Sequence, residues 1–459
     1  MNKTIKFFSK RFNRCFHSTR RNSINVCVIG SGPAGFYSAQ QLLKLIPEVK
    51  IDVYEKLPVP FGLVRFGVAP DHPDVKNVIS TFTKTANNPQ VNFVGNVTLG
   101  KDISIKDLKE AYHIILLTYG AEIDRELGIP GENLKNVISA RRFVGWYNGL
   151  PADSGLQLDL NTDTAVILGQ GNVAVDVARI LLSPIDLLKS TDITSNALEI
   201  LSSSKIKTVY LVGRRGPLQV AFTIKEFREM LKLPEVTTVL ETRHFNGVSE
   251  AIESLPRPRK RLTQLILDAS QKSPPETIAK KFSPLFFRSP TDFTGDQSVE
   301  KVNFTVNKLE GQKAVPSSEV DSLECGVALR SIGYKSISVD PDIPFNSETS
   351  TVLNKSGIYA AGWLATGPSG VILSTMSNAY QTAQLIHDDV KDKNVNCETS
   401  KPGFLLIKKI LQEKNIPIVD WAGWEKIDGA EKENGKNLGK CREKILNVEE
   451  MLSIGGKMV

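Results

Sequence analysis

Residues 26–35 read Val26-Cys27-Val28-Ile29-Gly30-Ser31-Gly32-Pro33-Ala34-Gly35, an apolar run that ends in a glycine-rich turn. The run predicts a buried strand, and apolar residues at helical spacing from Phe36 to Leu45 predict a helix directly after it. In such a unit the first glycine permits a tight turn, the second lets the backbone approach a pyrophosphate, and the third lets helix and strand pack closely. The stretch therefore predicts dinucleotide binding at Gly30, Gly32 and Gly35, with the pyrophosphate on the helix start.

A second predicted strand, Lys50-Ile51-Asp52-Val53-Tyr54-Glu55, follows the helix. It ends at Glu55, twenty residues after Gly35, where an acid can bond the ribose hydroxyls of an adenosine. A glycine turn of purely structural use is the alternative, but strand, helix, second strand and acid all fall where a nucleotide needs them.

The rest of the composition limits the class of protein. The chain has 459 residues, enough for two or three domains. Its five cysteines stand at 15, 27, 325, 397 and 441, and none forms a Cys-x-x-Cys pair. This argues against a structural zinc, a cysteine-bound cluster and a redox-active disulfide, and indicates reduced thiols. No apolar run is long enough to predict a membrane span.

Residues 1–22 differ from everything after them. They hold seven basic residues and no acid, and phenylalanines lie between the basic residues. Without these seven, the 57 basic residues fall to 50, equal to the 50 acids. An arginine-rich, acid-free N-terminus predicts a mitochondrial presequence. The alternative is a basic arm that binds phosphates.

The segment Pro58 to Pro73 is rich in proline and glycine, which predicts that it forms no regular helix. It is also too apolar for a solvated loop. We expect an ordered loop packed against something flat. A flavin is the better candidate beside a nucleotide-binding unit, and a buried connector is the alternative.

A second strand–turn–helix unit begins at Ala165-Val166-Ile167-Leu168-Gly169-Gln170-Gly171-Asn172-Val173-Ala174, with a helix to Leu182. Its later strand, Val209 to Gly213, ends in Arg214-Arg215 instead of an acid. An acid at this tip selects the ribose of NAD, whereas arginines accommodate the 2′-phosphate of NADP. The pair therefore predicts NADP, and a solvated turn is the alternative.

Four basic residues crowd into Arg257-Pro258-Arg259-Lys260-Arg261 on a chain that is otherwise neutral. The prolines predict an extended backbone. The patch is either a solubilising loop or a dock for an acidic partner. Nucleic acid is disfavoured, because no aromatic residues lie between the charges.

The last third of the chain contains two predicted strands, Leu329–Tyr334 and Gly357–Trp363. The second runs into a turn, Leu364 to Ile372, and then a helix to about Val390, which together complete the first nucleotide domain. The start of that helix would face the flavin ring, where a positive helix end suits the charge of a reduced flavin. The tail from Lys391 is polar, but Trp421 and Trp424 predict that part of it packs against the domain. It contains no motif that indicates a catalytic or binding role.

Taken together, these motifs resemble those of the adrenodoxin reductase family, the mitochondrial NADPH:ferredoxin reductases, over nearly the whole chain after the presequence. The resemblance implies an α/β fold of two doubly wound, Rossmann-like domains. The FAD domain would be discontinuous, 24–122 and 328–459, with an NADP domain, 123–327, inserted into it. No metal is implied.

The resemblance also implies roles for individual residues. FAD contacts fall on Ala34, Glu55, Leu63, Val97, Trp363, Gly370, Val371 and Ile372, in addition to the glycines of the first turn. NADP contacts fall on Gln170, Gly171, Asn172, Val173, Arg214, Arg215, Glu226 and Gly370, and ferredoxin-facing arginines on Arg228, Arg257 and Arg261. The animal enzymes carry a Lys-Arg pair where this chain has Ala365-Thr366, which bears on the choice of partner.

The implied activity is hydride transfer from NADPH to FAD, followed by release of single electrons to an acidic two-iron ferredoxin. That carrier would feed iron–sulfur cluster assembly or haem and steroid hydroxylation. His72 has a proton or docking role at most, and no side-chain nucleophile is needed. The setting would be the mitochondrial matrix, with a peripheral position on the inner membrane open.

Other activities use the same two-nucleotide plan. A thioredoxin-reductase-type enzyme would need a redox cysteine pair, and an electron-input module of a larger reductase would bring cysteine-rich segments; both are missing. A flavin monooxygenase and a non-catalytic nucleotide sensor remain open.

Overall fold

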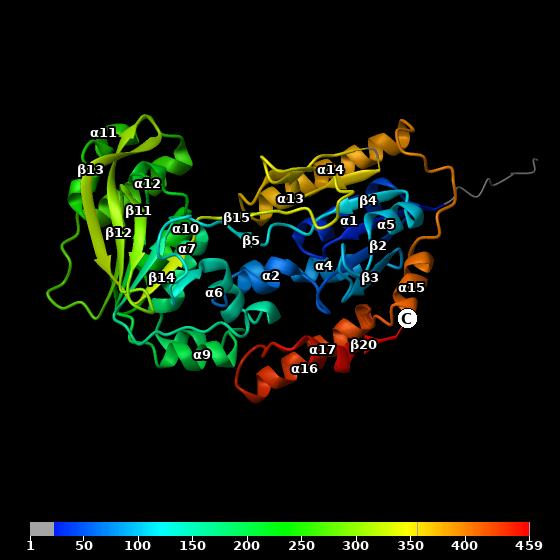
Figure 1. The fold of residues 1–459 in the computed structure, drawn as a ribbon, viewed down its shortest axis with the longest axis horizontal. Helices are drawn as coiled ribbons and strands as arrows, with labels where there is room; N and C mark the ends of the chain where they lie inside the picture. The colour runs from blue at the N-terminus through cyan, green and yellow to red at the C-terminus, as the bar shows by residue number, and fades with distance from the viewer. Residues whose placement is uncertain (1–22, 356, 459) are drawn as a thin grey trace, which may run out of the picture.

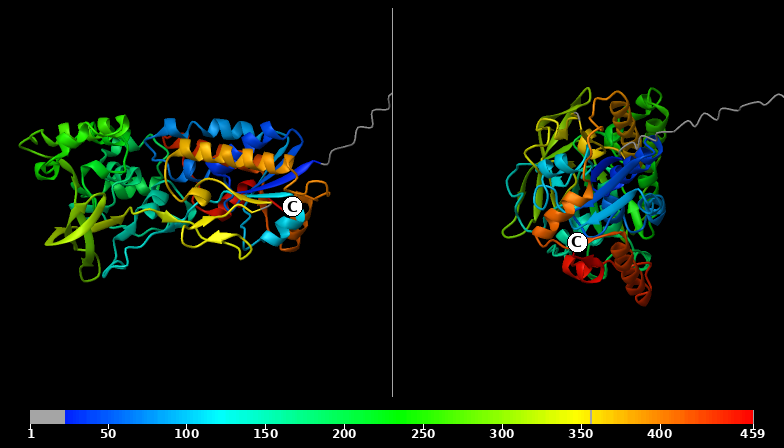
Figure 2. Two further views of the ribbon diagram at one scale, coloured as in Figure 1. Left: turned by 90° about the horizontal axis from the view of Figure 1, so that it is seen from above. Right: turned by 90° about the vertical axis from the view of Figure 1, so that its right-hand side faces the viewer.

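The computed structural model describes residues 23–355 and 357–458, which form two lobes (Figures 1 and 2). The predicted presequence, residues 1–22, lies outside the described residues. Strand β1 (Ile24–Ile29) forms where the apolar run stands, and pairs in parallel with its neighbours on both sides. In spatial order its sheet contains β18 (Ile358–Ala360), β4 (Ile114–Leu117), β1, β2 (Val49–Glu55), β3 (Val91–Gly95), β19 (Ile418–Val419) and β20 (Gly456–Lys457).

Helices cover both faces of this first sheet. Alternate residues of β1 point to opposite faces, so Val26 and Val28 pack on one side and Cys27 and Ile29 on the other. Helices α1 (Pro33–Leu45) and α14 (Ile372–Lys391) lie side by side on the first face, and α5 (Ile105–Ala111) and α15 (Phe404–Glu413) on the second. The predicted doubly wound arrangement is confirmed here.

The other lobe is built on a second parallel sheet. In spatial order it contains β6 (Val137–Ser139), β14 (Val327–Arg330), β7 (Thr164–Leu168), β8 (Thr208–Val212), β10 (Lys280–Leu285) and β9 (Val236–Thr238). One face packs against α6 (Ala140–Tyr147), α7 (Asn172–Leu182), α9 (Ser195–Ser202), α10 (Ile224–Leu231) and α12 (Arg257–Ser270).

The opposite face of the second sheet is covered by an antiparallel sheet of β11 (Arg288–Thr294), β12 (Lys301–Glu310) and β13 (Lys313–Glu324). Val166 and Leu168 of β7 pack there against Phe293 and Phe304. The sequence analysis did not foresee this layer, which Figure 1 shows at the outer end of the lobe.

The chain crosses between the lobes at β5 (Ile123–Asp124) and β15 (Tyr334–Lys335), which pair with each other. The predicted strand Leu329–Tyr334 is wrong as a single element, because β14 ends at Arg330 and Gly333 takes a positive φ of 94°. The predicted boundary at 327/328 falls at the start of β14, which pairs in the second sheet. We therefore propose that the NADP domain ends after Arg330.

Two predictions about proline-rich segments are corrected by the structure. The loop 58–73 contains a short helix, α2 (Gly62–Phe66), because these five residues include no proline, and α3 (Pro73–Lys76) begins at its end. The segment 256–261 is not extended, since α12 starts at Arg257 with Pro258 in its first turn. Proline is tolerated there because the first N–H groups of a helix have no partner within it.

The C-terminal tail, from Lys391, binds the loop 58–73 through a buried ion-pair network. Glu431, on α16 (Trp421–Asn437), is fully buried and lies between Arg65 of α2 and Arg442. Its Oε1 also accepts the N–H of Ile445 at 3.0 Å. Burial opposes ionisation, but the two guanidinium groups lower the pKa of Glu431. The carboxylate therefore holds three segments together.

Replacing Glu431 with alanine should lower stability by about 3–5 kcal/mol, because the buried Arg65 loses its counter-charge and Arg442 keeps only its ion pair with Asp428. We expect the thermal unfolding midpoint of the first domain to fall by roughly 10 °C. Glu433→Ala, an exposed position two residues along the same helix, is the control and should change little. Equal midpoints for the two variants would show that the network contributes nothing.

Candidate functional site

The first glycine turn combines two packed glycines with one open one. Gly30 has φ 109°, and a Cβ on it would lie 2.7 Å from the Thr118 carbonyl oxygen. A Cβ on Gly35 would lie 2.1 Å from the Gly30 oxygen. At Gly32, by contrast, no described heavy atom lies within 4 Å of the Cβ position. Gly30 and Gly35 are thus required by packing, whereas Gly32 faces open space.

Helix α1 starts directly at this open space. Its N-cap is Gly32, no side chain caps it, and Pro33 stands in its first turn. The free N–H groups and positive end of a helix bind anions such as a phosphate. The turn is therefore suited to the pyrophosphate predicted from the sequence.

Glu55, at the end of β2, bonds back to the glycine turn. Its Oε2 accepts the N–H of Ser31 at 3.0 Å and the Ser31 hydroxyl at 2.7 Å, and its Oε1 accepts the N–H of Leu57 at 3.2 Å. Burial raises the pKa of this carboxyl. Its predicted contact with a ribose stays a prediction, but the structure places the acid beside the turn as that role requires.

The loop 58–73 lines the open space on one side. Phe61 takes φ 84°, donates its N–H to the Ser31 oxygen at 3.1 Å, and packs its ring against Phe82, Trp421 and Trp424. A Cβ on Gly62 would lie 3.2 Å from the Gly32 Cα. The next side chain, Leu63, is 46% exposed. The loop therefore presents an apolar residue next to the turn.

The late segment predicted to face the flavin lies on another side of the turn. A Cβ on Gly362 would lie 2.6 Å from the Ala34 Cβ, so α13 (Trp363–Thr366) begins against the start of α1. Trp363 stacks on Tyr334 with ring centroids 5.9 Å apart. Val371, the N-cap of α14, is 50% exposed, and its N–H donates to the Ser374 Oγ at 3.0 Å.

The remaining predicted FAD residues differ in accessibility. Ile372 packs partly against the same apolar cluster as Phe61, and Gly370 is exposed with φ 85°. Val97 is buried in the core, and its N–H bonds the Glu55 carbonyl at 2.9 Å. The structure therefore does not bring the Val97 side chain to the open surface. Ala365 and Thr366 end α13, where Thr366 is exposed.

The second glycine turn repeats the first. Gly169 has φ 127° and would place a Cβ 2.1 Å from the Ser331 oxygen, whereas a Cβ on Gly171 would meet no described heavy atom within 4 Å. Helix α7 begins there without a side-chain cap, leaving Asn172 and Val173 in its first turn. Gln170 is fixed in the sheet, donating its amide to the Leu211 and Leu285 oxygens at 3.0 Å.

Two charges at the tip of β8 have no counter-charge among the residues that the structure describes. Arg214 is exposed and Arg215 half-buried, and within the described ranges neither side chain forms an ion pair. Uncompensated guanidinium groups are suited to a phosphate, which they bind through charge-assisted hydrogen bonds. The structure thus keeps the predicted NADP-selecting pair free for a ligand.

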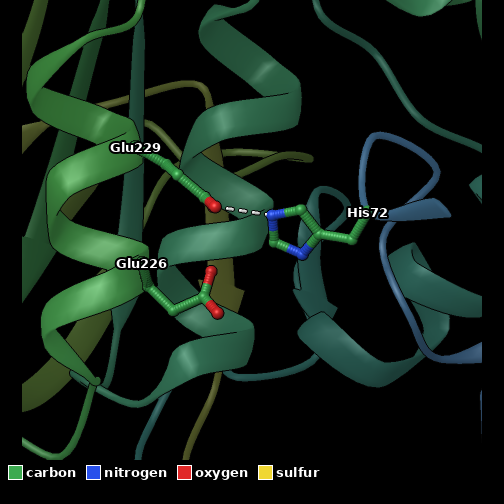
Figure 3. Close-up of side chains that lie close together, drawn as sticks. All are labelled: His72, Glu226 and Glu229. Carbon is green, nitrogen blue, oxygen red and sulfur yellow. Dashed lines mark hydrogen bonds and ion pairs between the residues drawn. The ribbon is translucent and has the colours of Figure 1, made fainter. Parts of the chain in front are cut away.

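A charged cluster lies where the two lobes meet. His72 Nε2 lies 2.6 Å from Glu229 Oε2, and Glu226 lies on the same helix, α10, facing the ring (Figure 3). Arg179 of α7 binds Asp71 at 2.5 Å and reaches Glu226 at 3.4 Å. His72, Glu226 and Glu229 could together ligate a cation, but the Arg179 guanidinium already lies within ion-pair distance of both acids.

Sequence reasoning found His72 and Glu226 but missed Asp71, Arg179 and Glu229. Arg179 is 3% exposed within the apolar helix α7. A charged residue on the buried face of a predicted helix was the signal that could have found it.

Glu226 should make stability depend on pH. Burial, together with the nearby carboxylate of Asp176, raises its pKa to about 8. Because the folded-state pKa exceeds the unfolded value, the stabilisation is complete below about pH 4.5 and is lost as the pH rises through 8. We expect the thermal midpoint to fall between about pH 5 and 8, and Glu226→Gln to flatten that fall. Glu250→Gln, an exposed position, should leave the slope unchanged.

The predicted partner-facing arginines lie on neighbouring helices. Arg228 is on α10, and Arg257 and Arg261 are on α12, which packs against it. All three are exposed and, among the described residues, without an ion pair. Arg259 instead donates to the Val220 oxygen at 2.5 Å, and Lys260 pairs with Glu253 at 2.6 Å.

Comparison with known proteins agrees with this geometry. A family described as an NAD(P)-binding Rossmann-like domain matches residues 28–94. The human NADPH:adrenodoxin oxidoreductase, mitochondrial, is 49% identical over 96% of this chain and 94% of its own length. The protein of the same name from Arabidopsis thaliana is 40% identical over 96% and 97%.

A solved structure, Mycobacterium tuberculosis FprA in complex with NADPH, superposes with a TM-score of 0.89 at 33% identity, covering 94% of this chain and 99% of that one. The identities and coverage far exceed what a shared fold alone would give. The chain belongs to the family of mitochondrial NADPH:adrenodoxin oxidoreductases.

Proposed function

We propose that the protein is a mitochondrial FAD-dependent oxidoreductase that takes electrons from NADPH and passes them singly to a two-iron ferredoxin. The observation that carries this function is the pair of open, uncapped glycine turns, one in each lobe, at Gly32 and Gly171. Membership of the family supports the same activity and the same two cofactors.

The residues around the first turn fit FAD. The open space at Gly32 has room for a pyrophosphate, the uncapped start of α1 favours its charge, and Leu63 and Val371 present exposed apolar surface. We assign Glu55 to the ribose. We assign further FAD contacts to Gly30, Ala34, Gly35, Val97, Trp363, Gly370 and Ile372, with Val97 acting through its backbone.

The second turn fits NADPH in the same way. We assign the pyrophosphate to the backbone of residues 170–173 and the 2′-phosphate to Arg214 and Arg215. Glu226 and Gly370 would contact the nicotinamide end. His72, bound to Glu229 across the lobes, would hold the α10 acids in place beside it.

The protein's own part in the reaction is positioning and electrostatics. FAD, when bound, would supply the redox chemistry, as the acceptor of a hydride and the donor of single electrons. The chain would hold the hydride donor, NADPH, and the acceptor, FAD, close together and correctly oriented. Such positioning can supply a large part of the rate acceleration. The charged cluster of His72, Glu226 and Glu229 lies at the junction of the lobes, where a proton can be exchanged.

The ferredoxin should dock on the α10–α12 surface of Arg228, Arg257 and Arg261. Changing Arg257 and Arg261 to glutamate should abolish ferredoxin-dependent cytochrome c reduction at low salt while flavin reduction by NADPH persists. Long-range attraction weakens as the screening length shrinks from about 10 Å at 0.1 M salt to about 3 Å at 1 M. High salt should therefore mimic the double variant, and ferricyanide reduction should respond much less.

The control for this test is Lys205→Glu with Lys207→Glu, which changes the net charge equally at exposed positions just beyond α9. It should leave the affinity for ferredoxin nearly unchanged. If both double variants lose affinity alike, the effect is one of net charge and the dock lies elsewhere.

The relatives are named mitochondrial. We propose the matrix as the compartment, with a peripheral position on the inner membrane, because that is where reduced thiols and a soluble ferredoxin are both found. No helix in the described part of the chain is long and apolar enough to cross a bilayer.

A further inference from the structure

Asp192 stands where three separate segments of the chain meet. It lies between α8 (Ile185–Leu188) and α9 of the NADP lobe. Both of its carboxylate oxygens lie 2.7 Å from the Nζ of Lys76, on α3 of the FAD lobe, and its Oδ2 lies 3.0 Å from the Nζ of Lys444 in the C-terminal tail. Lys444 is nearly inaccessible to solvent, at 1%, and Asp192 and Lys76 are each 12% exposed.

The tail segment 438–446 adds further bonds to the NADP lobe around this carboxylate. Lys440 donates to the Ile193 oxygen, and Glu443 Oε1 accepts the N–H of Ser195 at 2.9 Å. A Cβ on Gly149 would meet Leu446 at 2.9 Å, so the segment lies directly on the turn after α6. In Figure 1 the connection between α16 and α17 (Val448–Gly455) reaches toward α6 and α9.

The same segment is anchored to the FAD lobe. Arg442 binds Glu431 at 2.6 Å, and Glu431 also binds Arg65 on α2, the helix beside Gly32. Asp192 is therefore linked to the FAD lobe twice, once through Lys76 and once through the tail. The remaining described ion pairs between the lobes are His72–Glu229 and Arg179–Asp71 in the charged cluster, and the exposed pair Lys225–Asp74 beside it.

We propose that Asp192 is a positioning residue for hydride transfer, fixing the angle between the two lobes by binding Lys76 and Lys444 at once. This inference rests on the proposed function. Hydride transfer requires the reacting atoms to lie about 3–3.5 Å apart, and a misplacement of 1 Å can cost a hundredfold in rate. Each cofactor is held by its own lobe, so the angle between the lobes sets that distance.

The test compares Asp192→Asn with Asp192→Glu and Asp186→Asn in the FAD-loaded enzyme. Asp186 is the matched control, since its ion pair with Lys189 is 81% exposed on the acid side and lies within the NADP lobe. We expect Asp192→Asn to slow the bleaching of flavin by NADPH about tenfold in stopped flow. The dissociation constant for NADP⁺ should stay within twofold and FAD content should stay full. Asp192→Glu should restore most of the rate, and Asp186→Asn should match the parent.

Hydrogen exchange gives a readout that does not depend on activity. In Asp192→Asn, peptides covering 145–150 and 438–446 should exchange at least tenfold faster, while those covering β1 and β7 should be unchanged. Uniformly faster exchange with loss of FAD would mean general destabilisation and would overturn the proposal. So would a parental bleaching rate in Asp192→Asn, whatever the exchange shows.

If Asp192→Asn does not fold, Lys76→Gln breaks the same link from the FAD lobe, and the same outcomes apply to it. Failure of the proposed function itself looks different. NADPH would then not bleach the flavin of the parent protein at all, whereas exchange would still report whether Asp192 joins the lobes.

Discussion

The Gly32→Val variant should fold and bind no FAD. Its backbone φ of −77° suits any residue, and no described heavy atom lies within 4 Å of the Cβ position. The added Cβ therefore clashes with no described atom of the protein. It occupies the space into which the pyrophosphate must come, at the uncapped start of α1. The purified variant should be colourless, with a parental far-ultraviolet circular dichroism spectrum, where the parent carries about one FAD per chain.

Three further glycine variants make this result specific. Gly171→Val has the same open surroundings in the second turn, and it should keep FAD while losing NADPH binding. Gly30→Val and Gly35→Val should fail to fold, because their Cβ atoms would overlap the backbone at 2.7 and 2.1 Å. Full FAD occupancy in Gly32→Val would show that the pyrophosphate does not lie at this turn.

Replacing Arg214 and Arg215 together by alanine should raise the KM for NADPH by roughly two to four powers of ten. Each arginine makes charge-assisted hydrogen bonds to the 2′-phosphate worth about 1.5–3 kcal/mol. Neither has another ion-pair partner among the described residues. Removing them should therefore leave the rest of the lobe undisturbed. Steady-state kinetics with NADPH and NADH measures the change, and the KM for NADH should hardly move.

Arg228→Ala is the control, since it removes from the same lobe an exposed arginine that forms no ion pair with any described residue, at a position assigned to the ferredoxin. It should leave both KM values for the nicotinamide cofactors as they are. Equal losses for NADPH and NADH in the double variant would mean that the arginine pair shapes the fold instead of reading the phosphate.

The sequence predicted best what depends on local chemistry. Gly30, Gly32 and Gly35 each have a role set by their neighbours within a few residues, and the structure gives the outer two the tight packing and Gly32 the open space that those roles require. Arg214 and Arg215 were likewise identified by their place at a strand end. The family resemblance then supplied Leu63, Trp363 and Val371, whose exposure local patterns do not reveal.

What the sequence could not give depends on long-range pairing. Asp192 is an ordinary acid in a polar loop until the fold brings Lys76 and Lys444 to it, 116 and 252 residues away. No role was predicted for the C-terminal tail, because its Glu431 pairs with Arg65, which is 366 residues away in the sequence. The extended backbone predicted around Pro258 was wrong, since the same residue that disrupts a helix interior is well placed in a first turn.

The most direct test of the central claim is NADPH-dependent reduction of cytochrome c, with and without an acidic two-iron ferredoxin. We predict slow reduction without the ferredoxin, and fast, saturable reduction with it that falls steeply as salt is added. A rate that does not respond to ferredoxin, with NADPH oxidation matched instead by oxygen consumption, would rule out the proposed function and favour a monooxygenase.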